Sequence, residues 1–404
     1  MTISLSKIYN YVFILLCVSL PYENLVSALP NILLFLLGFL SLFLIKKEDI
    51  VSAFKKEKVF LSYVLIVVII FLFSLIHGEI KKDIIFLGKL LIPLVFIIIS
   101  LPIKNFDNLK KIFILSVFVA VVLSFFNIIN HIINSGNFKF SKGNFINDIL
   151  ISERLYMGFY CVISLICSLD LIQSSTKLKK LFVFNVIILT SFLFFITARI
   201  AIMSSALVLV YFIVYKLNKK QRVFFGILFF ALTSLFFILN KNLTKRFFHL
   251  DDVYNNGLLK KIKIHEPRYD IWKCSLEILS EENTLFLGNG YTHTKELLVA
   301  CYKDNIKIQK RQDWFVERKF NTHNQFLDFL LSYGFIGLIL LLVLFLLLFS
   351  RGKNTFLVNS LLGALILIMF VENIFHRQLG CYLFSLIFVI ILNIDKSWKH
   401  NLEQ

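Results

Sequence analysis

His323 is the side chain of this sequence best placed for acid–base chemistry, because it lies where a long polar segment meets a long apolar one. It belongs to the run Thr322–Gln325, and glycines follow at Gly334 and Gly337. A neutral imidazole can take a proton from a hydroxyl near pH 7. Asn324 can cap the following helix or orient the ring, and the glycines let the helix bend. A histidine that only lies at a membrane interface would fit the same position, so this residue alone leaves both interpretations open.

Arg199 is a candidate for anion binding, because it stands in a short apolar turn. The run Ile196–Ile200 contains no other charged side chain. A charge within a membrane-spanning segment costs at least about 2–3 kcal/mol, so this guanidinium is expected to need an anion. The planar fork of arginine can hold two phosphate oxygens at once, which favours a phosphate-bearing ligand.

Other charged side chains lie near the ends of the apolar segments. They are Lys89, His131, Glu153, Arg154, Glu372, His376 and Arg377 at the same ends as His323, and Asp170 near the opposite ends. Long basic side chains can also reach the interface without any function. That is the simpler interpretation of Lys89 and an alternative for Arg154 and Arg377. As a group, the cations favour an anionic lipid head group.

The elements that carry these residues are predicted to be membrane-spanning helices. Hydrophobic residues make up 58% of the 404 residues, so apolar stretches long enough to cross a bilayer recur along the chain. We identify twelve, at 8–20, 29–45, 59–77, 83–102, 112–133, 155–173, 180–197, 199–216, 223–239, 325–349, 355–375 and 379–394. The predicted fold class is an all-α polytopic membrane protein with about 12 transmembrane helices and one large external loop subdomain.

The basic residues indicate how these segments are oriented. The formal net charge is +18, but most Lys and Arg lie in short connections, so we do not predict a nucleic-acid partner. With a cytoplasmic N-terminus, the even-numbered connections hold more Lys and Arg than the odd-numbered ones. This is the positive-inside pattern. Both ends of the chain are then cytoplasmic, and His323 and Arg199 face the outside.

The predicted organisation separates one extramembrane subdomain from the helices. Helices 1–9 occupy residues 1–240, the external subdomain 241–323, helices 10–12 residues 324–396, and a cytoplasmic tail 397–404. In the subdomain, Leu287–Tyr291 has the composition of a tight turn. Cys274 and Cys301 lie there too, and they can pair in an oxidising compartment or remain free.

A helix is predicted to begin at Pro267 within this subdomain. Proline is tolerated in the first turn of a helix, where its missing N–H would have no partner. Trp272, Leu276 and Leu279 recur at helical spacing and are predicted to form the apolar face. Arg268 lies one turn before Trp272.

The sequence contains no motif for nucleotide or metal chemistry. It has no GxxxxGK[ST] phosphate loop and no Cys/His zinc spacing, and Asp251 and Asp252 alone do not make a metal site. We therefore expect no metal ion and no cofactor. ATP is absent outside the membrane, so a reaction there needs a pre-activated substrate such as a sugar on a lipid diphosphate. Fixed arginines can stabilise the departing diphosphate.

The polar motifs follow one another in a characteristic order. Thr197-Ala198-Arg199 forms an external turn, Arg268–Trp272 and Leu287–Gly290 lie in the long loop, and His323-Asn324 leads into Gly334–Gly337. This order resembles the O-antigen ligase family, with motifs over about 195–350 and a similar span count and loop placement over the whole chain. One departure is Asn321-Thr322, where many relatives have a second His or Ser.

The resemblance implies a metal-independent, inverting glycosyltransferase in the bacterial inner membrane, with its site facing the periplasm. Its donor would be a polysaccharide on undecaprenyl diphosphate, and its acceptor a sugar hydroxyl of lipid A–core. His323 would act on the acceptor as general base. The residues expected to bind substrate are Arg199, Arg268, Arg154, Asn324 and Arg377.

Two alternatives remain open. A polymerase would use the same donor but extend a second lipid-linked glycan. A non-enzymatic exporter of lipid-linked sugars would need polar groups through the full membrane depth, whereas here only Asp170 lies towards the other face.

Overall fold

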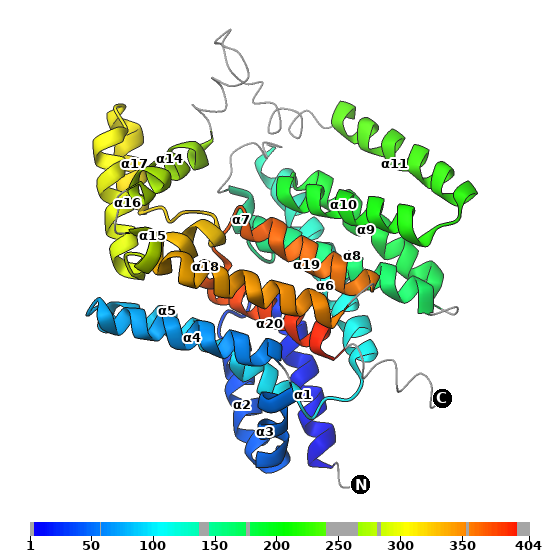
Figure 1. Cartoon of the computed structure of the whole chain (residues 1–404). Helices are drawn as coiled ribbons and strands as arrows, with labels where there is room; N and C mark the ends of the chain where they lie inside the picture. Colours follow the sequence, from blue (N-terminus) through cyan, green and yellow to red (C-terminus); the bar gives the residue numbers. More distant parts are fainter. Residues whose placement is uncertain are drawn as a thin grey trace.

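The computed structural model describes residues 4–56, 58–136, 145–174, 178–239, 266–280, 284–352 and 355–393. All regular secondary structure in these residues is helical (Figure 1). This confirms the predicted all-α fold class. Asp251, Asp252 and the segment 397–404 lie outside the described residues.

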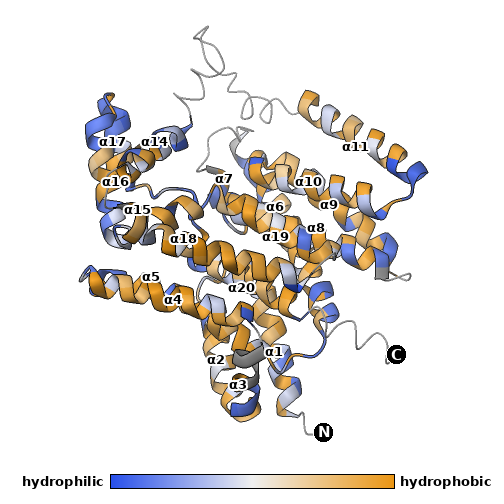
Figure 2. Cartoon of the chain, in the orientation of Figure 1, coloured by the Kyte–Doolittle hydropathy of each residue, from blue (hydrophilic) through white to orange (hydrophobic). Residues whose placement is uncertain are grey.

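Each of the twelve predicted apolar segments contains a helix. They are α1 (Leu5–Ser19), α2 (Leu29–Leu44), α4 (Lys58–Ile76), α5 (Ile80–Ser100), α6 (Phe106–Ser135), α8 (Arg154–Ser174), α9 (Lys179–Phe195), α10 (Arg199–Lys216), α11 (Lys219–Leu239), α18 (Gln325–Arg351), α19 (Phe356–Met369) and α20 (Gln378–Leu392). Within the described residues, eight helices are long and apolar enough to cross a membrane, with η1 (Leu20–Tyr22) extending α1. The shorter ones are α2, α9, α19 and α20, with 16, 17, 14 and 15 residues. The chain is therefore a multi-pass membrane protein, and Figure 2 shows the hydrophobic character of its long helices.

The centre of the bundle is α8, most of which is buried. It packs against α6, α9, α10 and α19. Gly158 lets α10 approach closely, since a Cβ at Gly158 would lie 2.8 Å from that of Ala201. α11 has no buried residue and lies at the edge of the bundle (Figure 1). Cys17, Cys161, Cys167 and Cys381 are buried free thiols that pack within the helical bundle.

A second, smaller core lies in the segment between α11 and α18. Its helices are α14 (Pro267–Leu279), α15 (Thr284–Leu287), α16 (Tyr291–Asn305) and α17 (Gln309–Arg318). Cys274 and Cys301 form a disulfide that joins α14 to α16. In the chain-entropy model, closing a loop of this length contributes about 3 kcal/mol to the free energy of unfolding.

Helix α14 begins at Pro267 as predicted, but of its predicted apolar face only Leu279 is buried. The buried side chains are Ile271, Cys274, Ser275, Ile278 and Leu279. Leu276 is 62% exposed and Trp272 36% exposed. The stripe at positions 271, 274 and 278 starts one residue before the predicted one, because this is the side of α14 that the disulfide holds against α16.

The bend predicted in α18 is confirmed at Gly334, whose φ of 61° interrupts the helix. The turn 288–290 packs against this bend. It donates two backbone hydrogen bonds to carbonyls of α18, both of 2.9 Å. A Cβ at Gly288 would lie only 2.5 Å from the backbone of Ser332, so this close contact requires glycine. The bend therefore gives the external helices a fixed attachment near the start of α18.

Candidate active site at the start of helix α18

His323 lies in a tight turn immediately before α18, with a left-handed φ of 44°. Its backbone N–H donates to the side-chain oxygen of Asn321 at 3.1 Å. Asn324 caps α18, since its side-chain oxygen accepts from the N–H groups of Phe326 and Leu327, both at 3.0 Å. Such a cap satisfies N–H groups that have no partner within the helix. The predicted capping role of Asn324 is confirmed.

The imidazole of His323 contacts a buried carboxylate. Its Nδ1 lies 3.3 Å from Oε2 of Glu372, and the side chains are 24% and 7% exposed. Among the described residues, no hydrogen bond engages Nε2 of His323. A histidine whose Nδ1–H donates to a carboxylate carries its lone pair on Nε2, which is the arrangement of a general base.

Glu372 is surrounded by positive charge. Burial alone would raise the pKa of this carboxyl group, but the hydrogen bond and electrostatic contact with His323, and the charges of Arg377 and Arg268, outweigh burial and lower the pKa. The Nε of Arg377 lies 3.8 Å from Oε1 of Glu372. Nη1 of Arg377 also donates to both carboxylate oxygens of Glu153, at 2.7 and 2.8 Å. Arg377, which we predicted to bind substrate, is thus held by acids of its own chain.

Arg199 and Arg268 converge on one carboxylate. Nη2 of Arg199 lies 3.1 Å from Oε2 of Glu266, and Nη1 of Arg268 lies 3.0 Å from Oε1. Burial would raise the pKa of Glu266, but the two guanidinium groups outweigh it and lower the pKa. Arg199 was expected to need an anion, and in the folded chain Glu266, which lies far from it in sequence, is that anion. No local spacing links the two residues, so sequence reasoning missed Glu266.

Helix α14 connects the arginines to the histidine. Nη2 of Arg268 donates to the carbonyl of Val371 at 3.0 Å, beside the carboxylate that contacts the imidazole. One turn later, Nε1 of Trp272 donates to the carbonyl of Thr322 at 3.0 Å, beside His323 itself. The arginine pair and the histidine therefore belong to one site, although they lie far apart in the sequence.

Arg154 is the first residue of α8, next in sequence to Glu153, which contacts Arg377. Its backbone N–H donates to the side chain of Asn147 at 3.0 Å. Its Nη1 is buried and has no hydrogen-bond partner in the described part of the chain. No contact between described residues joins Arg154 directly to His323 or to the arginine pair.

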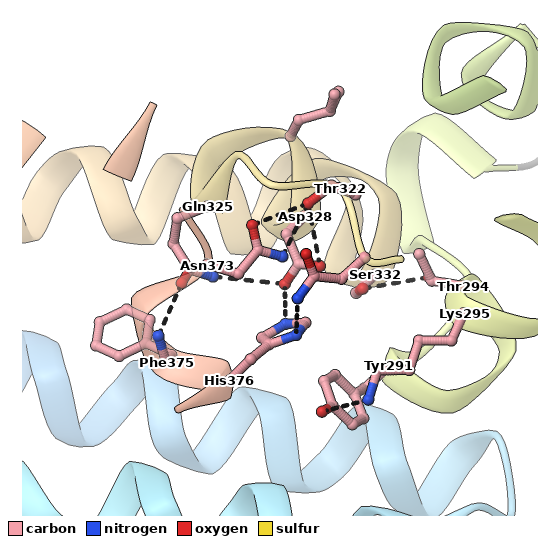
Figure 3. A network of polar contacts seen from close by, with 12 residues as sticks. Tyr291, Thr294, Lys295, Thr322, Gln325, Asp328, Ser332, Asn373, Phe375 and His376 are labelled. Atoms are coloured by element: carbon pink, nitrogen blue, oxygen red, sulfur yellow. Dashed lines mark hydrogen bonds and ion pairs between the residues drawn. The ribbon is translucent and has the colours of Figure 1, made fainter. Parts of the chain in front are cut away.

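A second histidine–carboxylate pair joins His376 to Asp328 (Figure 3). Nε2 of His376 lies 2.8 Å from Oδ2 of Asp328, and its Nδ1 lies 3.2 Å from the amide nitrogen of Asn321. Asp328 is 2% exposed. Lys89 donates to the backbone carbonyl of His376 at 2.8 Å. The sequence pattern singled out Lys89 and His376 but not Asp328. In the sequence, Asp328 is a single charged residue near the start of an apolar helix.

The polar network around this second pair joins the start of α18 to η2 (Ile374–His376). The amide nitrogen of Asn373 donates to the hydroxyl of Thr322 at 2.9 Å, and the side-chain oxygen of Gln325 accepts from the N–H of Phe375 at 3.0 Å (Figure 3). Buried polar groups of this kind stabilise a fold only when each has a partner. The network holds Glu372 and His323 at a fixed separation.

One group of side chains has the spacing of a metal site within the described residues. It consists of Cys274, Glu277 and Cys301, whose ligand atoms lie within 4.8 Å of one another. The two cysteines are joined as a disulfide, so they offer no thiolate to a metal ion. This group lies in the external core and includes none of the residues around His323.

Comparison with known proteins supports the family expected from the motifs. No curated protein matches the chain. The family model described as O-antigen ligase matches residues 184–342, a segment that contains Arg199, Arg268 and His323. Proteins of this kind are membrane enzymes of the O-antigen ligase or polymerase type. The predicted resemblance is confirmed: residues 184–342 of this chain match the family model described as O-antigen ligase.

Proposed function

We propose that this protein transfers a polysaccharide from undecaprenyl diphosphate to a sugar hydroxyl of lipid A–core, at the periplasmic face of the bacterial inner membrane. The observation that carries the proposal is the convergence of Arg199 and Arg268 on one carboxylate, beside the His323–Glu372 pair. Two guanidinium groups that share one anion through separate oxygens are suited to a diphosphate. In this proposal the donor diphosphate takes the place of the Glu266 carboxylate between them.

The reaction is a direct displacement at the anomeric carbon. His323 accepts the proton of the acceptor hydroxyl on Nε2, and the hydroxyl oxygen forms the new glycosidic bond. The bond between the anomeric carbon and the diphosphate oxygen breaks, its electron pair leaves with the lipid diphosphate, and the configuration inverts. Arg199 and Arg268 offset the charge that develops on the leaving group, which is transition-state stabilisation by fixed charges. The proposed reaction uses no metal ion.

The remaining predicted residues have supporting roles in this proposal. Asn324 fixes the start of α18 behind the histidine, and Arg377 lies against Glu372. Arg154 offers a buried guanidinium nitrogen near the same end of the bundle. We assign it to the lipid-linked donor on the strength of the family resemblance.

Reconstitution of the purified protein tests the function. The protein would be placed in vesicles with lipid-linked polysaccharide and, in separate reactions, with lipid A–core or a second lipid-linked glycan. The proposal predicts polysaccharide-capped lipid A–core, and none with His323→Ala. Extension of the second lipid-linked glycan alone would identify a polymerase. Movement of the donor across the bilayer with no glycosidic product would identify an exporter.

The orientation can be tested separately. Single cysteines would be introduced at exposed positions of α17 and at 217–221, and intact cells treated with a membrane-impermeant thiol reagent. The proposed periplasmic site requires labelling in α17 and none at 217–221. Labelling at 217–221 would reverse the orientation and remove the periplasmic site.

A further inference from the structure

Glu372 is a buried carboxylate that the proposed reaction does not yet use. It lies in the short segment between α19 and η2 and is 5% exposed. Its two oxygens approach two different side chains, Oε2 towards Nδ1 of His323 at 3.3 Å and Oε1 towards Nε of Arg377 at 3.8 Å. A buried carboxylate without partners is strongly destabilising, so the imidazole N–H and the guanidinium group stabilise Glu372 in its ionised form.

The residues on either side of Glu372 are also held by hydrogen bonds. Arg268 donates to the carbonyl of Val371 at 3.0 Å, and Asn373 donates to Thr322 at 2.9 Å. The residues on both sides of Glu372 are therefore tied to α14 and to the turn that carries His323. The charged and titratable groups that face the carboxylate are His323, Arg377, Arg268 and, through its hydroxyl, Tyr156.

We propose that Glu372 is the positioning residue of the transfer reaction, which accepts the Nδ1–H of His323 and so presents Nε2 to the acceptor hydroxyl. This inference rests on the proposed function. When Nε2 takes the hydroxyl proton, the ring becomes an imidazolium and keeps its Nδ1–H. The carboxylate stays ionised throughout and stabilises the new positive charge. No further proton donor or acceptor is required.

Asp328 does not fit this role, although it is a buried carboxylate near the same turn. Its Oδ2 contacts Nε2 of His376, and the other ring nitrogen of that histidine is engaged by Asn321. A proton taken up by His376 would require one of these contacts to break. Among the described residues, the His323 ring has a hydrogen-bond partner at Nδ1 only, so Glu372 is the carboxylate that can act through a base with a free nitrogen.

The test is a double-mutant cycle on the full-length protein in vesicles, with lipid-linked polysaccharide and lipid A–core. Glu372→Gln keeps the size of the side chain and removes its charge. We expect kcat per folded molecule to fall by roughly 10- to 150-fold, the range for losing a hydrogen bond to a charged group, with KM for the donor little changed. Glu372→Asp should recover part of the loss. Glu317→Gln, the same change at an exposed position of α17, is the matched control.

The decisive comparison is the double variant His323→Ala with Glu372→Gln. If Glu372 acts through the histidine, the double variant should be no slower than His323→Ala alone. Multiplied losses would show that Glu372 acts independently of His323 and would overturn the inference, as would full kcat in folded Glu372→Gln. Failure of the proposed function looks different, because the wild-type protein itself would then yield no capped lipid A–core.

Discussion

Two histidine–carboxylate pairs lie side by side at the start of α18, and they differ in how completely they are bonded. In the His376–Asp328 pair the side chains are 7% and 3% exposed, and both ring nitrogens have partners. In the His323–Glu372 pair the histidine is 24% exposed, and within the described residues only Nδ1 has a partner. In the proposed reaction, the same two functional groups form a structural contact in one place and a base with its positioning carboxylate in the other.

Both pairs connect the same two segments, but each segment supplies the histidine of one pair and the acid of the other. The start of α18 supplies His323 and Asp328, and the segment before α20 supplies Glu372 and His376. Each segment therefore provides one histidine and one acid. We infer that the His376 pair holds the two segments at the separation that the His323 pair needs. Variants that affect one pair and not the other should separate catalysis from stability.

Among the residues proposed to bind the donor, the largest effect is expected at the arginines. Arg199→Lys and Arg268→Lys keep the charge but lose the fork that binds two oxygens. We expect each to reduce transfer by roughly 10- to 150-fold, the range for losing a hydrogen bond to a charged group. The measurement is the initial rate of capping in vesicles at equal amounts of folded protein. Wild-type rates in both lysine variants would remove the arginines from donor binding.

On the structural side, Asp328→Asn should act on folding. It leaves the buried ring of His376 with a weaker partner, which is expected to lower the free energy of unfolding by about 1–3 kcal/mol. Thermal unfolding in detergent would measure this, with the capping rate per folded molecule determined in parallel. If Asp328→Asn melts normally but loses its rate, the His376 pair takes part in the chemistry and the contrast between the pairs fails.

The smallest effect is expected where the network reaches solvent. The side chains of Arg377 and Glu153 are 50% and 36% exposed. Exposed ion pairs contribute about 0–1 kcal/mol, so Glu153→Gln should shift the unfolding transition only slightly. The capping rate should fall less than in Glu372→Gln. A larger loss than in Glu372→Gln would place the main support of the histidine at Glu153.

The sequence predicted the local features of the site and missed its tertiary partners. The cap at Asn324, the bend at Gly334 and the helix start at Pro267 follow from the preferences of single residues, and all three are confirmed. Glu266 illustrates the other class. Its ion pair with Arg199 forms only because the start of α10 and the start of α14 are brought together in the fold. No residue spacing in the sequence indicates that contact.

The energetic cost of placing charged residues near apolar segments identified candidate site residues but not their partners. It singled out Glu372, His376 and Arg377 as residues that needed an explanation, without indicating which partner each would take. The pairing of His323 with Glu372 rather than with Asp328 depends on the position of η2, which only the folded structure supplies. The error at the α14 face has a similar cause, since the disulfide sets which side of that helix is buried.

The central claim is that His323 is the base of the transfer reaction. The most direct test is the single-turnover rate of His323→Ala, measured with the enzyme in excess over the donor. Donor binding is measured on the same preparation. Loss of a general base is expected to lower the rate per bound donor by about 10²–10⁴-fold while donor affinity stays close to that of the wild type. A variant that instead loses donor binding and keeps its rate per bound donor would show that His323 is a phosphate ligand, and the account of this site would be wrong.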